Sequence, residues 1–176
     1  TFRSGLAETI ISHLHDVAER ICKKYNIGKK SLVIDVGSND GTLLQGYKNK
    51  NMEVLGIDPA KEIAAEANNS GVNTISEFLN EKLSKDIVDE YGKAKVINCF
   101  NAFAHADNMI ELTKSIVNLM SKDGIFVFEV SYLVDIIEKT LLGAVIHEHL
   151  SHHSLLSLEV FLIKFNLELI YVERNS

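Results

Sequence analysis

Histidine is concentrated in the last third of the chain, in the segment IHEHLSHHS over residues 146–154. His105 adds another imidazole upstream of that segment. Because an imidazole exchanges a proton near neutral pH, such histidines can remove a proton from a bound molecule or return one. Glu148 stands directly before His149. Two other interpretations stay open: a surface turn whose histidines cap a helix, and a metal site. The HEH spacing does not place two metal ligands on one helical face, so we expect no metal.

A glycine turn lies between two short apolar runs. It consists of Gly37, Ser38, Asn39, Asp40 and Gly41. Glycine lets a backbone adopt positive φ and approach a ligand closely, and the free N–H groups of a helix that starts there favour an anionic group such as a carboxylate. The spacing is not the GxGxxG of a pyrophosphate site. A plain tight turn is the alternative.

Three residues that follow later apolar runs could complete a ligand site. Asp58 comes about 20 residues beyond the glycines, where a carboxylate can accept hydrogen bonds from both hydroxyls of a ribose. It could instead cap the helix near Pro59. Phe78 could cover a flat purine or pack in the core, and Asn101 could bond a methionine-like group. Together these residues predict a nucleoside site.

The chain alternates between short apolar runs and amphipathic stretches. The apolar runs predict strands over residues 31–36, 53–58, 72–75, 95–100, 125–130 and 168–173. The amphipathic stretches predict a first helix, capped by Ser4 and ending near Gly28, and further helices over residues 41–50, 59–68, 80–91, 108–120, 133–139 and 157–165. Residues 122–124 are expected to form a turn.

Strands that alternate with helices indicate an α/β fold. Such connections are right-handed crossovers, which give a mostly parallel, doubly wound sheet with helices on both faces. Ligands bind such sheets at the carboxyl ends of the strands, where the candidate residues stand. We expect six strands in one domain over residues 1–176, with residues 1–30 forming a helix that leads into the core.

The composition limits the class of partner. The net charge of -6 leaves no excess of lysine and arginine for nucleic acid or an anionic membrane surface. No apolar run approaches the roughly 20 residues of a membrane span, and the first residues do not resemble a signal peptide. Cys22 and Cys99 lie far apart in the sequence, without the spacing of a disulfide framework or a zinc site. Cysteines used in this way are typical of a reducing compartment, so we expect a cytoplasmic protein. Without an initiator Met, the chain is expected to be part of a longer protein.

Four motifs, VIDVGSNDGTLL, VLGIDPA, NAFAHADN and KDGIFVFEVSYL, resemble those of class I S-adenosylmethionine-dependent methyltransferases. With IHEHLSHHS, the chain is similar over nearly its whole length to the sugar C-methyltransferases that act on nucleotide-linked 4-keto deoxysugars. The resemblance implies a Rossmann-like methyltransferase sheet, S-adenosyl-L-methionine as the cofactor, and a nucleotide sugar as the small-molecule substrate.

The resemblance also implies roles for the histidine segment. His149 is the base that removes a proton beside the keto group, and Glu148 orients the substrate or the imidazole. His105 stabilises the enolate or serves as a second base. The enolate carbon, which we expect to be C3, then takes the methyl group. For His152 and His153 we favour the helix-capping turn.

Departures from the family keep two alternatives open. Family members carry a cysteine-rich zinc-binding segment before this region and a further domain after it, and neither is in this sequence. Ile146 stands where the family has a tyrosine. The chain could therefore methylate an oxygen or nitrogen of another small molecule, or be a catalytically inactive cofactor-binding module. We also expect self-association or a partner chain, because one edge or slot of the sheet would be left unfilled.

Overall fold

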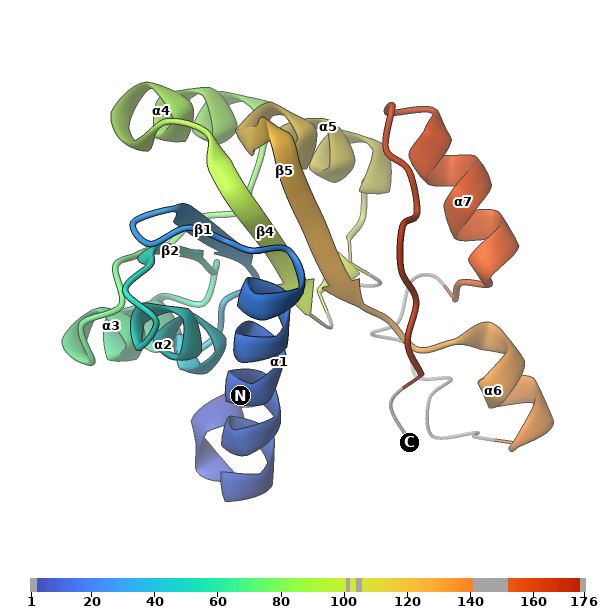
Figure 1. The fold of residues 1–176 in the computed structure, drawn as a ribbon, viewed down its shortest axis with the longest axis horizontal. Helices are drawn as coiled ribbons and strands as arrows, with labels where there is room; N and C mark the ends of the chain where they lie inside the picture. Colours follow the sequence, from blue (N-terminus) through green and yellow to red (C-terminus); the bar gives the residue numbers. More distant parts are fainter. Residues whose placement is uncertain (1–2, 101, 104–105, 141–151, 175–176) are drawn as a thin grey trace.

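The computed structural model describes residues 3–100, 102–103, 106–140 and 152–174, which form an α/β fold around one parallel sheet (Figure 1). The strands are β1 (Leu32–Val36), β2 (Glu53–Ile57), β3 (Thr74–Ile75), β4 (Ala94–Phe100) and β5 (Met120–Glu129). Their order in the sheet is β3-β2-β1-β4-β5. The predicted doubly wound architecture is confirmed, because the order runs outward in both directions from β1.

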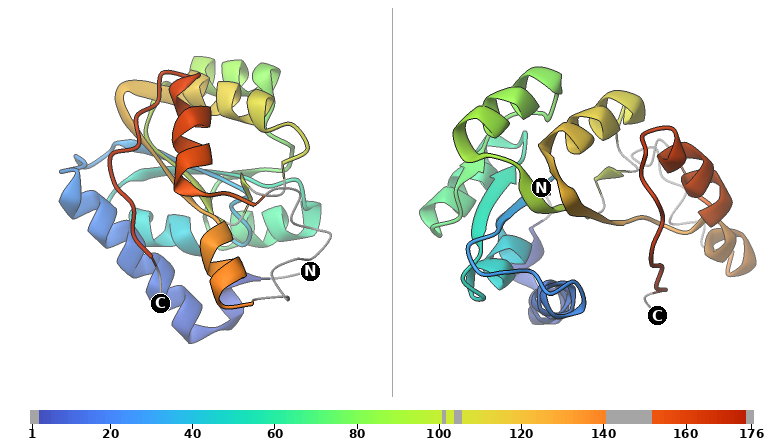
Figure 2. Two further views of the ribbon diagram at one scale, coloured as in Figure 1. Left: turned by 90° about the vertical axis from the view of Figure 1, so that its right-hand side faces the viewer. Right: turned by 45° about the horizontal axis from the view of Figure 1, so that its top comes forward.

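Helices cover both faces of the sheet (Figures 1 and 2). They are η1 (Ser4–Leu6), α1 (Glu8–Lys24), α2 (Thr42–Lys48), α3 (Lys61–Asn69), α4 (Glu81–Tyr91), α5 (Met109–Leu119), α6 (Leu133–Glu138) and α7 (Leu155–Ile163). One face is covered by α1, α2 and α3, and the other by α4, α5 and α7. Within the described residues, no helix is long and apolar enough to cross a membrane.

The core has one apolar layer on each face of the sheet. Side chains alternate between the faces along a strand, so Ile34 packs in the layer under α4 and α5, whereas Val33 packs under α1 and α2. Every residue of β1 is buried, as expected for the middle strand of a parallel sheet. This two-sided core fixes the carboxyl ends of the strands, where the candidate residues lie.

The prediction of a sixth strand over residues 168–173 is wrong. That segment is extended but belongs to no sheet in the described structure, which has five strands. It is tied to α1 instead. Arg20 forms an ion pair with Glu173 at 2.8 Å, and the Lys24 ammonium lies over the Tyr171 ring. Strand pairing depends on a distant partner, which the local apolar pattern cannot supply.

The fifth strand starts earlier than predicted. It begins at Met120 and includes residues 122–124, which we expected to form a turn. The pairing register with β4 shifts between Ala94 and Val96. Such an irregularity lets a strand take in additional residues, so the local turn signal does not end the strand.

The boundaries of two helices also differ from the prediction. Ser4 does not cap the first long helix but begins η1, and α1 starts at Glu8 without a side-chain cap and ends at Lys24, before Gly28. Pro59 lies two residues before α3. Side chains do cap α4, α5 and α7: Asn80, Asn108 and Ser154 each accept a backbone N–H of the first turn.

Candidate active site

The glycine turn joins the carboxyl end of β1 to α2 in a conformation that requires glycine. Gly37 has φ of +76° and Gly41 has φ of +81°, and Asn39 between them is also left-handed at +51°. A Cβ atom on Gly37 would lie 2.6 Å from that of Ala102. The N–H groups of Gly37 and Ser38 donate to the carbonyl of Ile57, at 2.8 and 3.2 Å. The turn is therefore held against the end of β2.

Asp58, directly after β2, is connected to this turn. It is 7% exposed. One carboxylate oxygen accepts the N–H of Asn39 at 2.8 Å, and the other accepts the N–H of Ala60 at 2.9 Å. Because α3 begins without a side-chain cap, Asp58 is not its N-cap. Each carboxylate oxygen can accept more than one hydrogen bond, so Asp58 retains capacity for ligand hydroxyls.

A cavity of about 730 Å³ lies at the carboxyl ends of the strands. Its wall is formed by the glycine turn, by the residues that follow β2, β3 and β4, by the end of β5, and by one side of α1. The volume falls in the range of small-molecule sites. Phe78 lines the cavity and is 76% exposed, so the core-packing interpretation of this ring is wrong. Its flat face is available to a ligand.

Carboxylates dominate the ionisable groups of the cavity wall. They are Asp35, Asp58, Glu77, Asp107, Glu111 and Glu129. Among the described residues that line the cavity, there is neither lysine nor arginine. Such a wall favours a cationic ligand and disfavours an anionic one.

Asp35 is a site residue that the sequence interpretation missed. It lies within β1, is 3% exposed, and lines the cavity. Burial, and secondarily the charge of Asp58, raise the pKa of Asp35 to about 8. Its Oδ1 atom has no hydrogen-bond partner among the described residues. A charged residue inside the apolar run LVIDV was the signal that could have identified it.

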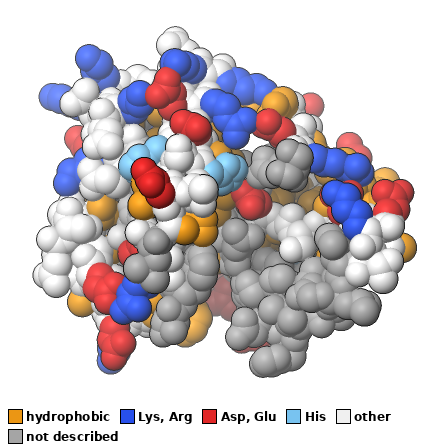
Figure 3. Space-filling model, turned by 90° about the horizontal axis from the view of Figure 1, so that it is seen from below, with side chains coloured by type: hydrophobic (Ala, Val, Ile, Leu, Met, Phe, Trp, Pro, Cys, Tyr) orange, Lys and Arg blue, Asp and Glu red, His pale blue; other side chains and the backbone are white. Residues whose placement is uncertain are grey.

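His13 and Glu129 were also missed. Both line the cavity, and the Nε2 atom of His13 lies 3.8 Å from the Oε2 atom of Glu129. Glu129 is the last residue of β5, and His13 is in the first half of α1. Figure 3 shows histidine and acidic side chains near one another on the face seen from below. No local motif could have predicted this pair, because its members are far apart in the sequence.

Comparison with known proteins identifies the family. A family model described as a methyltransferase domain matches residues 6–172. The chain belongs to this family. The predicted class, S-adenosylmethionine-dependent methyltransferases, is thereby confirmed for this domain.

The relatives of this methyltransferase domain include both carbon-methylating and other enzymes. It is 31% identical to the C-methyltransferase NovU of Streptomyces niveus over 152 residues, which is 86% of the chain but only 36% of NovU. The magnesium protoporphyrin IX methyltransferase ChlM from Synechocystis PCC 6803, solved with bound SAH, is 13% identical. The match covers 94% of this chain and 77% of ChlM, with a TM-score of 0.72.

A third relative is the plantazolicin methyltransferase BpumL, in complex with SAH and a desmethylPZN analog. It matches 90% of this chain and 65% of its own, with a TM-score of 0.68 and 20% identity. These structural similarities show that the methyltransferase domain has the fold of enzymes that bind SAH.

Several predicted site residues of the methyltransferase domain lie outside the described residues. These are Asn101, His105, Glu148 and His149, together with Ile146. The described residues include no group of three His, Cys, Asp or Glu side chains that could hold a metal ion.

The interpretation of His153 as a helix cap on the surface is wrong. Ser154 caps α7, and His153 is only 8% exposed. Its ring centroid lies 6.1 Å from that of Phe103, and its carbonyl accepts the N–H of Leu133 at 2.9 Å. Burial, followed by the charge of His152, lowers the pKa of His153. His153 is therefore a buried residue that packs near Phe103, and it is mainly neutral at pH 7.

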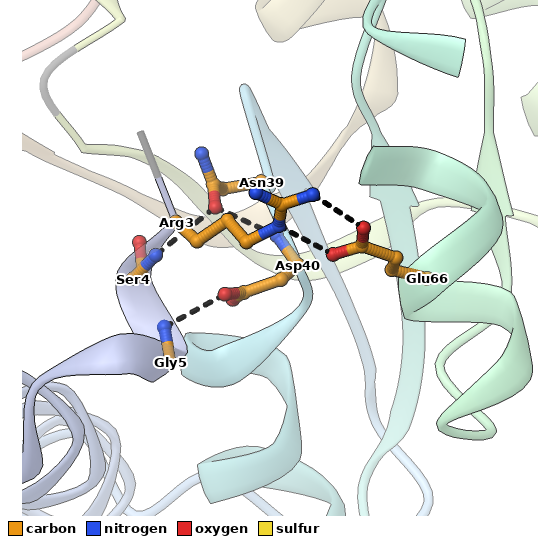
Figure 4. Close-up of polar contacts among 6 residues, drawn as sticks. All are labelled: Arg3, Ser4, Gly5, Asn39, Asp40 and Glu66. Carbon is orange, nitrogen blue, oxygen red and sulfur yellow. Dashed lines mark hydrogen bonds and ion pairs between the residues drawn. The ribbon is translucent and has the colours of Figure 1, made fainter. Parts of the chain in front are cut away.

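The N-terminal segment is fastened to the glycine turn from outside (Figure 4). The N–H of Ser4 donates to Oδ1 of Asn39 at 3.1 Å, and the N–H of Gly5 donates to Oδ2 of Asp40 at 2.7 Å. Arg3 forms a two-bonded ion pair with Glu66 of α3, at 2.6 and 2.7 Å. The turn is thus fixed both by β2 and by η1.

Proposed function

We propose that this domain transfers a methyl group from S-adenosylmethionine to a carbon, C3, beside the keto group of a nucleotide-linked deoxysugar. The observation that carries the proposal is the 31% identity to a C-methyltransferase over 86% of the chain. The acidic cavity supports the cofactor part of it, because S-adenosylmethionine brings a sulfonium and an ammonium group. A cytoplasmic location is part of the proposal.

The binding roles follow from the cavity wall. The carboxylate of Asp58 accepts the ribose hydroxyls, and Phe78 covers the adenine ring. Gly37, Ser38 and Asn39 of that wall, with Gly41 just outside it, let the methionine end approach the backbone at the start of α2. Asn101 bonds the same end of the cofactor. These roles would leave the ends of β4 and β5 to the acceptor.

The proposed reaction has two steps. The imidazole of His149, oriented by Glu148, takes the proton from the carbon beside the ketone, and the electron pair moves toward the carbonyl oxygen. His105 donates a hydrogen bond to that oxygen and stabilises the enolate. The enolate carbon then forms a bond to the methyl carbon while the bond to sulfur breaks, so the neutral thioether leaves. The abstracted proton remains on His149 until solvent removes it.

The described end of the histidine segment, residues 152–154, supports this arrangement. Tyr132, three residues after the end of β5, forms a bridge with His153. The chain that leaves the sheet at β5 therefore returns to the same place after the segment with Glu148 and His149. Because β5 ends at the cavity wall, His153, which follows that segment, lies beside the chain that leaves this wall.

An oxygen or nitrogen methyltransferase is a second candidate, and one observation favours it. The described wall of the cavity has six carboxyl groups but neither lysine nor arginine, so it offers no lysine or arginine cation for a sugar diphosphate. A neutral or cationic acceptor would suit such a wall. In the sugar proposal, the diphosphate must lie outside this cavity, with only the sugar ring inside.

Hydrogen exchange distinguishes carbon methylation from the alternative. The protein is incubated in deuterated water with thymidine-diphosphate-linked 4-keto-6-deoxyglucose and no methyl donor, and NMR follows the proton on C3. We expect enzyme-dependent exchange, and a new carbon-bound methyl group once S-adenosylmethionine is added. Methylation on oxygen or nitrogen, or an absence of both exchange and methylation, would contradict the proposal.

The base is tested by His149→Ala, with His152→Ala as the control in the same segment. We expect His149→Ala to lower turnover by about 10²–10⁴-fold and to abolish exchange, while cofactor affinity changes little. The imidazole acts on the acceptor and does not hold the nucleoside. Undiminished exchange in this variant would assign the base elsewhere, with His105 as the next candidate.

A further inference from the structure

His13 and Glu129 line the cavity but have no part in the reaction outlined above. We propose that they form the acceptor-binding end of the cavity, where together they hold one hydroxyl group of the sugar ring. This inference rests on the proposed function, since it assigns the sugar ring to a particular part of the site. Both are positioning residues for the acceptor, and neither is required to bind the cofactor.

The position of Glu129 in the sheet separates it from the cofactor residues. Gly37 and Asp58 follow β1 and β2, and Phe78 follows β3. Glu129 ends β5, on the other side of β4, where it is paired with Phe100. Neighbouring strands are about 4.8 Å apart, so β5 lies roughly 10 Å from β1. A nucleoside bound at the ends of β1, β2 and β3 therefore leaves the region of Glu129 to a second molecule.

The distance between the two side chains suits a shared hydroxyl. At 3.8 Å, Nε2 of His13 and Oε2 of Glu129 are too far apart for a direct hydrogen bond. One oxygen atom to the side of the line that joins them can accept the Nε2–H of His13 and donate its own proton to Oε2 of Glu129. A sugar hydroxyl has this combination of donor and acceptor on one atom. The side chains are 40% and 33% exposed, so a ligand in the cavity can reach both.

The charges of the cavity wall also favour this assignment. His13 is the single histidine among the described residues of the wall, whose other ionisable groups are six carboxyl groups and the buried thiol of Cys99. At this point of the wall, the N–H of His13 can donate a hydrogen bond and a nearby carboxylate can accept one. A neutral sugar ring with several hydroxyl groups can use both. The competing explanation is a purely structural role, in which the pair holds α1 against the end of β5.

The experiment measures the KM for each substrate in matched variants, with thymidine-diphosphate-linked 4-keto-6-deoxyglucose as the acceptor. In His13→Leu and Glu129→Leu, we expect the acceptor KM to rise about 10-fold or more, because each loses one hydrogen bond to the hydroxyl. His13→Gln and Glu129→Gln retain an amide donor or acceptor and should restore most of the affinity. The doubly substituted Leu variant should be little worse than either single one, because both residues bind the same group.

The controls are His15→Leu, two residues along α1 and outside the cavity wall, and Glu138→Leu, an exposed position on α6. The KM for S-adenosylmethionine and the melting temperature should stay near wild-type values in all variants. A lower melting temperature with an unchanged acceptor KM would identify the pair as a mechanical clamp and overturn the inference. A wild-type protein that neither binds nor methylates the probe would overturn the proposed function and this inference together.

Discussion

The carboxylate of Asp58 has two tasks at once, because it holds two backbone N–H groups of the site and faces the cavity. We expect Asp58→Ala to weaken S-adenosylmethionine binding by about 1.5–3 kcal/mol, the range for hydrogen bonds to a charged group. Calorimetry on the folded variant measures it. Asp58→Asn keeps one acceptor oxygen and should lose less.

Asp86→Asn, an exposed position on α4, is the control for Asp58. It should bind the cofactor as the wild type does. If Asp58→Ala also kept its full affinity, the carboxylate would only hold the backbone, and the ribose would be bound by other groups.

Asp35 makes the stability of the ligand-free protein depend on pH. The pKa of its carboxyl is raised to about 8 in the folded state by burial and by Asp58, whereas an unfolded aspartate titrates near 4. Between about pH 4 and pH 8 the folded state keeps a proton that the unfolded state has lost. The free energy of unfolding therefore falls as pH rises through this window, and the contribution levels off above it.

Asp35→Asn should remove this pH dependence and stabilise the ligand-free protein at pH 8 relative to the wild type. Denaturant unfolding at pH 5 and pH 8 tests it. A cationic cofactor beside Asp35 favours the carboxylate, so S-adenosylmethionine should release a proton on binding near pH 7. Calorimetry in two buffers of different ionisation enthalpy measures the released proton. If the Asp35→Asn variant still released a proton on binding the cofactor, Asp35 would be excluded as the group that releases it.

At the scale of the elements, the turn between β1 and α2 is where local conformation and cofactor binding meet. Gly37→Ala would force a side chain into φ of +76° and bring its Cβ to 2.6 Å from that of Ala102. We expect a loss of stability of about 1–3 kcal/mol and weaker cofactor binding, since the turn must shift. Chemical denaturation and calorimetry report the two effects.

Gly28→Ala is the matched control, because the nearest atom to its added Cβ would be the Ser31 hydroxyl oxygen at 3.9 Å and Gly28 has no positive φ. This variant should leave both measurements near the wild-type values. An equal loss of stability and cofactor affinity in the two variants would mean that neither the positive φ of Gly37 nor its approach to Ala102 is the cause.

Elements whose signals are local were predicted well from the sequence. The continuous apolar run at residues 31–36 predicted β1 to within one residue. A strand that is buried on both faces has apolar side chains on both, so its sequence does not alternate between apolar and polar residues. The cavity at one edge of the sheet is lined by Gly37, Asp58 and Phe78, because all parallel strands have their carboxyl ends at the same edge.

Features set by distant parts of the chain could not be predicted. The run at residues 168–173 has the pattern of a strand, yet Arg20 and Lys24 hold it beside α1. The pairing of His13 with Glu129 depends on how α1 crosses the end of β5, which no spacing encodes. The raised pKa of Asp35 depends in the same way on burial that only the assembled sheet provides.

At the scale of the whole molecule, apolar side chains remain exposed on the side of β5. Leu156, Val160 and Ile163 recur at helical spacing along one face of α7, and they are 71%, 54% and 61% exposed. Ile170 and Val172 are also exposed, because their segment is not part of the sheet. In the described structure, β5 pairs with β4 on one side alone. Exposed apolar patches and open strand edges both favour association.

We therefore expect the domain to self-associate through α7, because burying this face removes apolar surface from water. Sedimentation velocity over a range of concentrations should show a shift from monomer to a larger species. Val160→Lys puts a charge in the middle of the face and should move the equilibrium toward monomer. Ile110→Lys changes an equally apolar residue, 53% exposed, on α5, and should leave association unchanged. A wild-type protein that stays monomeric at every concentration, or an equal response to both variants, would contradict this role of α7.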